Sequence, residues 1–228
     1  MADTNSFDCD RNLSKKAAVI LSGCGVMDGS EIHEAVVTIL SLKKAGAEIS
    51  FFAPNIKQFD VVNHLEAKSY QGQTRNVLEE SARIARGQIS KLDDFRARDF
   101  DAVFFPGGFG AAKNLCDFAI NGADCKVEES VLRVIKDSLE NNVKLGFICI
   151  APVIAAKAIG AGVELTIGND ASTASAIEAM GAVHVECSAT CFVKDSKLPV
   201  YSTPSYMLAK DIAELETGIS SMVSAMLA

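Results

Sequence analysis

The feature that most constrains the fold is an alternation of short, almost wholly apolar runs with longer amphipathic segments. Apolar runs of strand length lie at 16–21, 48–52, 101–105 and 143–149, and apolar residues at helical spacing follow in 31–45, 127–140 and 150–159. Strands without polar positions are buried on both faces, as in a parallel sheet covered by helices. The alternation therefore predicts an α/β fold with a mostly parallel central sheet.

The same criteria predict the domain organisation and the remaining elements. Residues 1–14 are polar and read as a disordered lead-in, and residues 15–228 form one domain with an insertion at about 54–100. Inside the insertion we expect a helix over 75–86, capped by Thr74 and closed by Gly87, and a strand over 88–92. After residue 160 we expect short strands at 163–167, 183–186, 191–194 and 200–202, and helices over 172–180 and from about 205.

Composition restricts the partners and the compartment. The net charge of −7 argues against nucleic acid or an anionic membrane as a partner, and no apolar run reaches the length of a bilayer span. Seven cysteines, an odd number at irregular spacing, indicate reduced thiols and a cytoplasmic protein. Only Cys187 and Cys191 lie close in sequence and no histidine pattern accompanies them, so we expect no metal site.

The strongest candidate for chemistry is the segment Gly146–Pro152 (GFICIAP), where a buried strand ends at Cys149 and a helix begins at once. This arrangement is typical of a nucleophile elbow, and the first amides of the following helix would favour a thiolate. Pro152 suits the first helical turn, where its missing N–H costs nothing. The alternative is an ordinary core cysteine at the end of a strand.

Two further segments follow predicted strands, at the sheet edge where open α/β folds bind ligands. In Pro106–Gly110 (PGGFG), the Gly108 amide could join that of Ile150 as an oxyanion hole, unless this is a plain glycine turn. In Ser30–Glu34 (SEIHE), Glu31 and Glu34 share a helix face. A carboxyl turned inward there would have a raised pKa and could exchange a proton with a thiol, although first-turn acids often only complement the helix dipole.

Taken together, these segments resemble the superfamily of class I glutamine amidotransferases, PfpI-type proteases and the parkinsonism-associated glyoxalase/deglycases. The more specific resemblance is to the enhancing-lycopene-biosynthesis subfamily, also called sigma cross-reacting proteins. It extends over Leu21–Val36 (LSGCGVMDGSEIHEAV), Phe52–Leu65, Thr74–Glu80 (TRNVLEE), Phe105–Leu115 (FPGGFGAAKNL), Gly146–Pro152, Leu165–Asp170 (LTIGND) and Ser202–Ala209 (STPSYMLA). The resemblance implies a flavodoxin-like three-layer α/β/α sandwich, a homodimer, a Cys149 nucleophile with Glu34 as its carboxyl partner, and an oxyanion hole at Gly108 and Ile150.

One departure from the superfamily bears on function. Many members place a catalytic histidine after the strand that follows the elbow, where this chain has Thr166–Asp170. Only His33, His64 and His184 exist; the first two, with Glu31, remain candidates for a base or a substrate contact. The resemblance implies a glyoxalase that converts methylglyoxal or glyoxal to a 2-hydroxy acid without glutathione or cofactor, through a Cys149 adduct with Glu34 as proton shuttle. The alternatives are an amidotransferase-like hydrolase with a degenerate triad and a redox-sensing or binding protein linked to isoprenoid metabolism.

Overall fold

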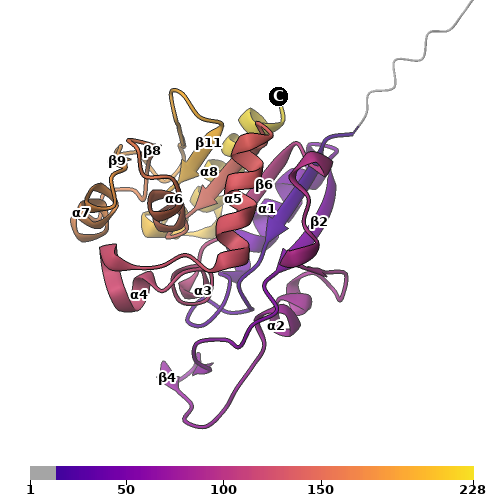
Figure 1. The fold of residues 1–228 in the computed structure, drawn as a ribbon, viewed down its shortest axis with the longest axis vertical. Helices are drawn as coiled ribbons and strands as arrows, with labels where there is room; N and C mark the ends of the chain where they lie inside the picture. The colour runs from indigo at the N-terminus through magenta and orange to yellow at the C-terminus, as the bar shows by residue number, and fades with distance from the viewer. Residues whose placement is uncertain (1–13) are drawn as a thin grey trace, which may run out of the picture.

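A computed structural model describes residues 14–228, so nearly all of the expected disordered lead-in, 1–14, lies outside the described residues. The centre of the molecule is a seven-stranded sheet in the order β10-β11-β7-β6-β1-β2-β5 (Figure 1). Every neighbouring pair is parallel except β10 with β11. The strands are β1 (Lys16–Ile20), β2 (Glu48–Ala53), β5 (Ser90–Lys91), β6 (Ala102–Phe105), β7 (Lys144–Ile148), β10 (Val193–Lys194) and β11 (Val200–Thr203).

Alternate residues of the central strands enter two separate hydrophobic clusters, because successive side chains of a strand point to opposite faces. Val103 and Phe105 of β6 pack with α5 (Glu129–Glu140) and α6 (Pro152–Ile159). Ala102 and Phe104 pack with α1 (Ile32–Lys44) and α8 (Ile212–Leu227) on the other face. The expected three-layer α/β/α sandwich with a mostly parallel sheet is therefore confirmed, and Figure 1 shows α5 and α6 on one side of the sheet and α1 and α8 on the other.

Two predicted helix starts were wrong because another polar residue supplies the cap. Helix α2 (Val77–Ile84) is capped by Asn76, whose side chain accepts from the Glu79 amide, and not by Thr74. The last helix begins at Ile212 because Asp211 accepts from the amides of residues 213 and 214. Between β11 and that helix lies one 3₁₀ turn, η4 (Ser205–Met207).

The segment 54–100 lies partly beside the sheet and partly in it. Strand β5 pairs with β2 and forms the sheet edge, whereas the hairpin of β3 (Val62–Asn63) and β4 (Lys68–Ser69) projects away from it (Figure 1). Two 3₁₀ turns, η1 (Leu92–Asp94) and η2 (Ala97–Asp99), lead back to β6. The hairpin was missed because its strands are two residues long and mostly polar.

The last segments surround the carboxyl end of the sheet. They are α3 (Phe109–Lys113), α4 (Phe118–Asn121), η3 (Gly122–Asp124) and α7 (Ala171–Ala179). Strands β8 (Glu164–Leu165) and β9 (Val183–His184) pair with each other as a separate parallel sheet. Within residues 14–228, no helix has the length and apolarity needed to cross a bilayer.

Candidate active site

Cys149 occupies the sharp turn between β7 and α6. Its φ of +62° lies in the left-handed region, which residues with a side chain seldom adopt and which recurs at functional turns. The Cys149 amide donates to the carbonyl of Thr203 at the end of β11, at 3.0 Å. Helix α6 then begins at Pro152, so the nucleophile elbow expected from the sequence is present.

Glu34 is fully buried behind the thiol, in the first turn of α1. Its Oε2 accepts from the Gly107 amide at 2.9 Å, and its Oε1 accepts from the Tyr206 amide at 3.3 Å. A Cβ at position 107 would lie 2.5 Å from Cys149 Cβ and 2.6 Å from Glu34 Oε2. The missing side chain of Gly107 is therefore what lets the thiol and the carboxyl approach each other.

Burial raises the proton affinity of both the thiol and the carboxyl. Burial, with a smaller effect from the neighbouring Glu31 charge, raises the pKa of Glu34 to about 7; hydrogen bonding from Cys149 opposes this. Burial also raises the pKa of Cys149 well above its ordinary value, and the Glu34 carboxylate raises it further. The expected thiolate is therefore wrong for this site at rest: burial and Glu34 outweigh the amides at the helix start. The thiol therefore keeps its proton near neutral pH, where the Glu34 carboxyl titrates.

The amides of Gly108 and Ile150 lie next to the Cys149 sulfur and partly offset the rise in its pKa. Gly108 has a φ of +91°, and a Cβ there would come within 2.5 Å of the Gly29 carbonyl oxygen. Only glycine fits this turn, which points its N–H at the thiol. The structure thus brings together Cys149, Glu34 and both amides that the sequence singled out, in a geometry suited to holding a developing oxyanion.

The remaining predicted residues lie away from the Cys149 sulfur, and most of them accept hydrogen bonds from backbone amides. Glu31 lines the cavity described below, and its carboxylate accepts from the Glu34 amide at 2.7 Å as the cap of α1. His33 is exposed, and its Nδ1 pairs with the Tyr206 hydroxyl at 2.8 Å. His64 accepts from the Met27 amide through Nε2 at 3.1 Å. His184 accepts from the Ile167 amide at 3.5 Å.

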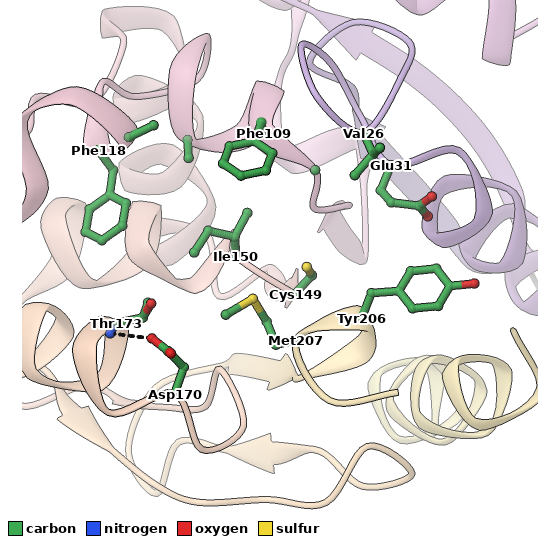
Figure 2. A pocket seen from close by; sticks show the side chains of 13 residues that line it. Val26, Glu31, Phe109, Phe118, Cys149, Ile150, Asp170, Thr173, Tyr206 and Met207 are labelled. Carbon is green, nitrogen blue, oxygen red and sulfur yellow. Dashed lines mark hydrogen bonds between the residues drawn. The ribbon is translucent and has the colours of Figure 1, made fainter. Parts of the chain in front are cut away.

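A cavity of about 530 Å³ opens over Cys149. Phe109 and Val26 lie on one side of it, Met207 and Tyr206 on the other, and Ile150 beside the sulfur (Figure 2). Among the described residues no histidine lines it, and Glu34 reaches it only through Cys149. Nor does any group of three or more potential metal ligands occur within residues 14–228.

The segment after β11 contributes three site residues that sequence reasoning did not assign. Ser205, with a φ of +47°, is buried beside Glu34, and its hydroxyl meets no partner with good hydrogen-bond geometry, although its proximity lowers the carboxyl's pKa. Tyr206 supplies an amide to Glu34, and Met207 lines the cavity. The available signal was the position of 202–209 directly after a strand, at the same sheet edge as Cys149.

Comparison with known proteins places this geometry in a family. No family model matches the chain. Glutamine amidotransferase-like class 1 domain-containing protein 3 of Homo sapiens is 45% identical over 217 residues, which cover 91% of this chain and 81% of that protein. The ES1 protein homologue of Rattus norvegicus is 44% identical over 221 residues, covering 93% and 83% respectively. The chain belongs to this ES1 family.

Solved structures agree with the ES1 assignment. An isoprenoid biosynthesis protein with an amidotransferase-like domain from Ehrlichia chaffeensis is 36% identical, with a TM-score of 0.87 over 93% of this chain and 98% of that one. A DJ-1 superfamily protein from Salmonella typhimurium, 21% identical with a TM-score of 0.56 over 92% of this chain and 89% of that one, shares the fold. The resemblance to amidotransferase-like and PfpI-type proteins is confirmed.

The predicted cytoplasmic location is wrong. The human and rat ES1 relatives are named as mitochondrial proteins, and so is the ES1 protein of Danio rerio, which is 37% identical over 85% of this chain and 77% of its own length. Unpaired cysteines argue only against oxidising compartments, and so they could not distinguish these two locations.

Proposed function

We propose that the protein is a glyoxalase that converts an α-oxoaldehyde to a 2-hydroxy acid at Cys149. The observation that carries the proposal is the contact between the buried thiol and the Glu34 carboxyl, beneath the two amides of Gly108 and Ile150. A base that works at neutral pH should have a pKa near 7, and burial raises the pKa of Glu34 to about that value. The site thus combines a nucleophile, a matched proton carrier and an oxyanion hole.

The reaction can be written with these groups and water alone. The Cys149 sulfur attacks the aldehyde carbon while the thiol proton moves to the Glu34 carboxylate. The aldehyde oxygen, held by the Gly108 and Ile150 amides, then takes that proton and a neutral hemithioacetal results. Glu34 next removes the proton from the same carbon to give an enediolate. The hydroxyl proton on that carbon passes to the oxygen of the neighbouring carbon, and Glu34 returns its proton to the neighbouring carbon, which gives the thioester of the 2-hydroxy acid. Water finally hydrolyses the thioester, which releases the 2-hydroxy acid and restores the thiol.

Two observations make the alternatives weaker. The amidotransferases of this superfamily use a histidine as the base beside the cysteine, and among the described residues no histidine lines the cavity. A redox sensor needs an accessible thiolate, whereas Cys149 is 8% exposed and its pKa is raised by burial and by Glu34. The name of the Ehrlichia neighbour supports a link to isoprenoid metabolism, and such a link is compatible with an oxoaldehyde substrate.

The test is turnover of methylglyoxal by the purified protein with glutathione absent, followed as lactate formed. We expect turnover by the wild type and none by Cys149→Ser or Cys149→Ala. Circular dichroism and thermal melting establish that the variants are folded. A folded wild type that forms no 2-hydroxy acid from methylglyoxal or glyoxal would refute the proposal, and peroxide titration of Cys149 would then test the sensor alternative.

We also propose the homodimer. Helix α1 exposes Ile32, Val36 and Leu40, which are spaced four residues apart and therefore share one face of the helix. An exposed apolar stripe of this kind is typical of an interface. Sedimentation should give twice the 24.2 kDa chain mass at micromolar concentration, and a Val36→Lys variant should shift the protein toward the monomer.

A further inference from the structure

The cavity over Cys149 is larger than a three-carbon substrate requires. Its volume of about 530 Å³ lies within the range of roughly 300–1,000 Å³ typical of sites for larger small molecules. Methylglyoxal, with three carbons and two oxygens, would fill a small part of it. The surplus space lies along Ile150, Phe109 and Phe118, on the side of Cys149 opposite Tyr206 (Figure 2).

The charges around this space are all of one sign. Among the described residues, no lysine or arginine lines this space, whereas Glu31 and Asp170 both line it. Lys113, whose ammonium lies 5.4 Å from the centre of the Phe109 ring, is paired with Asp60 at 3.1 Å. The pKa of Asp170 lies below its ordinary value because Thr173 hydrogen-bonds it, which keeps it negative. A carboxylate or phosphate entering here would meet repulsion and no cation.

The start of helix α7, which reaches the same wall, offers no anion site either. Asp170 caps it, and its carboxylate accepts from the Thr173 amide at 2.7 Å (Figure 2). The helix end is therefore already satisfied by the chain's own carboxylate. On the other side, the Tyr206 hydroxyl points away from Cys149 and pairs with His33, so Tyr206 turns its ring toward the cavity.

From this wall we infer that the site takes neutral α-oxoaldehydes with an apolar body of branched-alkyl or aryl type, and excludes those that carry a carboxylate or a phosphate. The inference rests on the proposed function and narrows its substrate class. The aldehyde end reacts at Cys149, and the apolar body lies against Ile150, Phe109 and Phe118.

The first experiment compares two substrates of similar size. 4-Methyl-2-oxopentanal carries a neutral branched chain, and 4,5-dioxopentanoate carries a carboxylate on an unbranched chain. We expect kcat/KM for the first to exceed that for the second by about tenfold or more, and to exceed that for methylglyoxal, because apolar contacts discriminate by about this factor. Equal values, or a preference for the anion, would overturn the inference.

Two pairs of variants test which cavity residues cause the substrate preference. Phe118→Ala should lower the ratio of kcat/KM for 4-methyl-2-oxopentanal to that for methylglyoxal, and Ile120→Ala, an exposed residue of α4 outside the cavity lining, should leave it unchanged. Asp170→Asn, which keeps a capping side chain, should raise the relative rate on 4,5-dioxopentanoate about threefold. Its control is Glu178→Gln, farther along α7 and exposed. Identical shifts in a variant and its control would contradict the assignment.

A readout without turnover separates this inference from the proposed function. We compare alkylation of Cys149 by neutral iodoacetamide and anionic iodoacetate, using peptide mapping and a free thiol in solution as reference. The iodoacetamide-to-iodoacetate rate ratio at Cys149 should exceed the reference ratio about tenfold, and Asp170→Asn should reduce it. A raised rate ratio without oxoaldehyde turnover would support the preference for neutral ligands and refute the glyoxalase function. Turnover with a rate ratio equal to the reference and no substrate preference would support the glyoxalase function and refute the preference for neutral ligands.

Discussion

Beneath the cavity, Cys149 and Glu34 are held by backbone groups at strand ends: the amides of Gly107 and Tyr206 and the carbonyl of Thr203. We call Cys149, Glu34 and Gly107 the floor. The loop 23–29 above it is held by side chains from elsewhere, which include His64 on the Met27 amide and Lys113 on the Met27 carbonyl at 3.1 Å. We call this loop and its two partners the rim.

The difference shows where the molecule tolerates change. The floor is almost fully buried, and each polar group there has a fixed partner, so a lost atom leaves an unpaired group or a clash. The His64 side chain in the rim is 37% exposed, and water can replace a contact that is lost there. The following predictions test whether catalysis depends on the floor, and whether the rim affects only local stability.

The largest effect is expected from Glu34→Gln, which keeps the shape of the floor and removes its proton carrier. Turnover of an oxoaldehyde should fall by about 10²–10⁴-fold, the range for a general acid–base group. Glu31→Gln is the matched control from the same helical turn, where the carboxylate serves as a cap, and it should lose much less. The reverse ranking would assign proton transfer to Glu31.

Gly107→Ala should come next. The added methyl would lie between the Cys149 Cβ and Glu34 Oε2, and a displacement of this size costs about 10²-fold in rate and ~1–3 kcal/mol in the free energy of unfolding. Gly87→Ala is the control, because Gly87 has a φ of +82° and open space around it. It should lose stability without losing turnover. Full activity in Gly107→Ala would show that the thiol and carboxyl need not meet.

The third prediction concerns stability against pH. Because the pKa of Glu34 is about 7 in the folded protein and near 4.5 when unfolded, the folded state holds its proton more tightly between these values. The stability this group contributes is therefore present below pH 4.5 and is lost as pH rises through 7. The free energy of unfolding of wild type minus that of Glu34→Gln should fall by about 3 kcal/mol between pH 4.5 and 8, measured by urea denaturation. A flat difference would contradict the raised pKa.

A smaller effect, opposite in sign to the loss of turnover, is expected for thiol reactivity. Glu34→Gln removes the charge that raises the pKa of Cys149, so iodoacetamide should alkylate Cys149 roughly tenfold faster at pH 7.5. Exposed Cys191 should react at an unchanged rate and serves as the internal reference. A slower reaction at Cys149 would mean that Glu34 activates the thiol at rest.

The smallest effects should come from the histidines. His64→Ala removes one contact of the rim and His33→Ala one contact of Tyr206, so each should keep turnover within about threefold and lose ~1 kcal/mol of stability. If folded His64→Ala lost all turnover, a histidine would belong to the reaction after all, and an amide substrate would become the better hypothesis.

The sequence predicted the floor better than the rim, for a physical reason. Buried strands leave an unbroken apolar run, and residues that follow such runs meet at one sheet edge, which located Cys149 and Gly108. The family resemblance then selected Glu34 over Glu31. Strands of two residues, as in the β3–β4 hairpin, carry no periodicity that could be recognised. Thr74 and Asn76 are both good caps, and only tertiary packing selects the second.

The protonation state of Cys149 also depends on tertiary contacts that the local sequence does not show. The helix start that lowers a thiol's pKa can be read locally from the residues that follow it. The burial that raises it, and the carboxylate 115 positions earlier that reinforces the rise, become visible only when the sheet is assembled. For the same reason the contacts of Ser205 and Tyr206 with Glu34 could not be predicted, although their position after a strand placed them at the same sheet edge.

The hydrogen bond from the Tyr206 amide to Glu34 joins residues 172 positions apart, and that from Gly107 spans 73. Contacts of such long range form only after the intervening chain has been ordered, at a high cost in loop entropy, and they belong to the slow part of folding. The thiol environment is therefore completed only when the first helix and the last strand have both joined the sheet. A nascent or partly unfolded chain carries the cysteine without its carboxyl partner, and only the finished fold has the site.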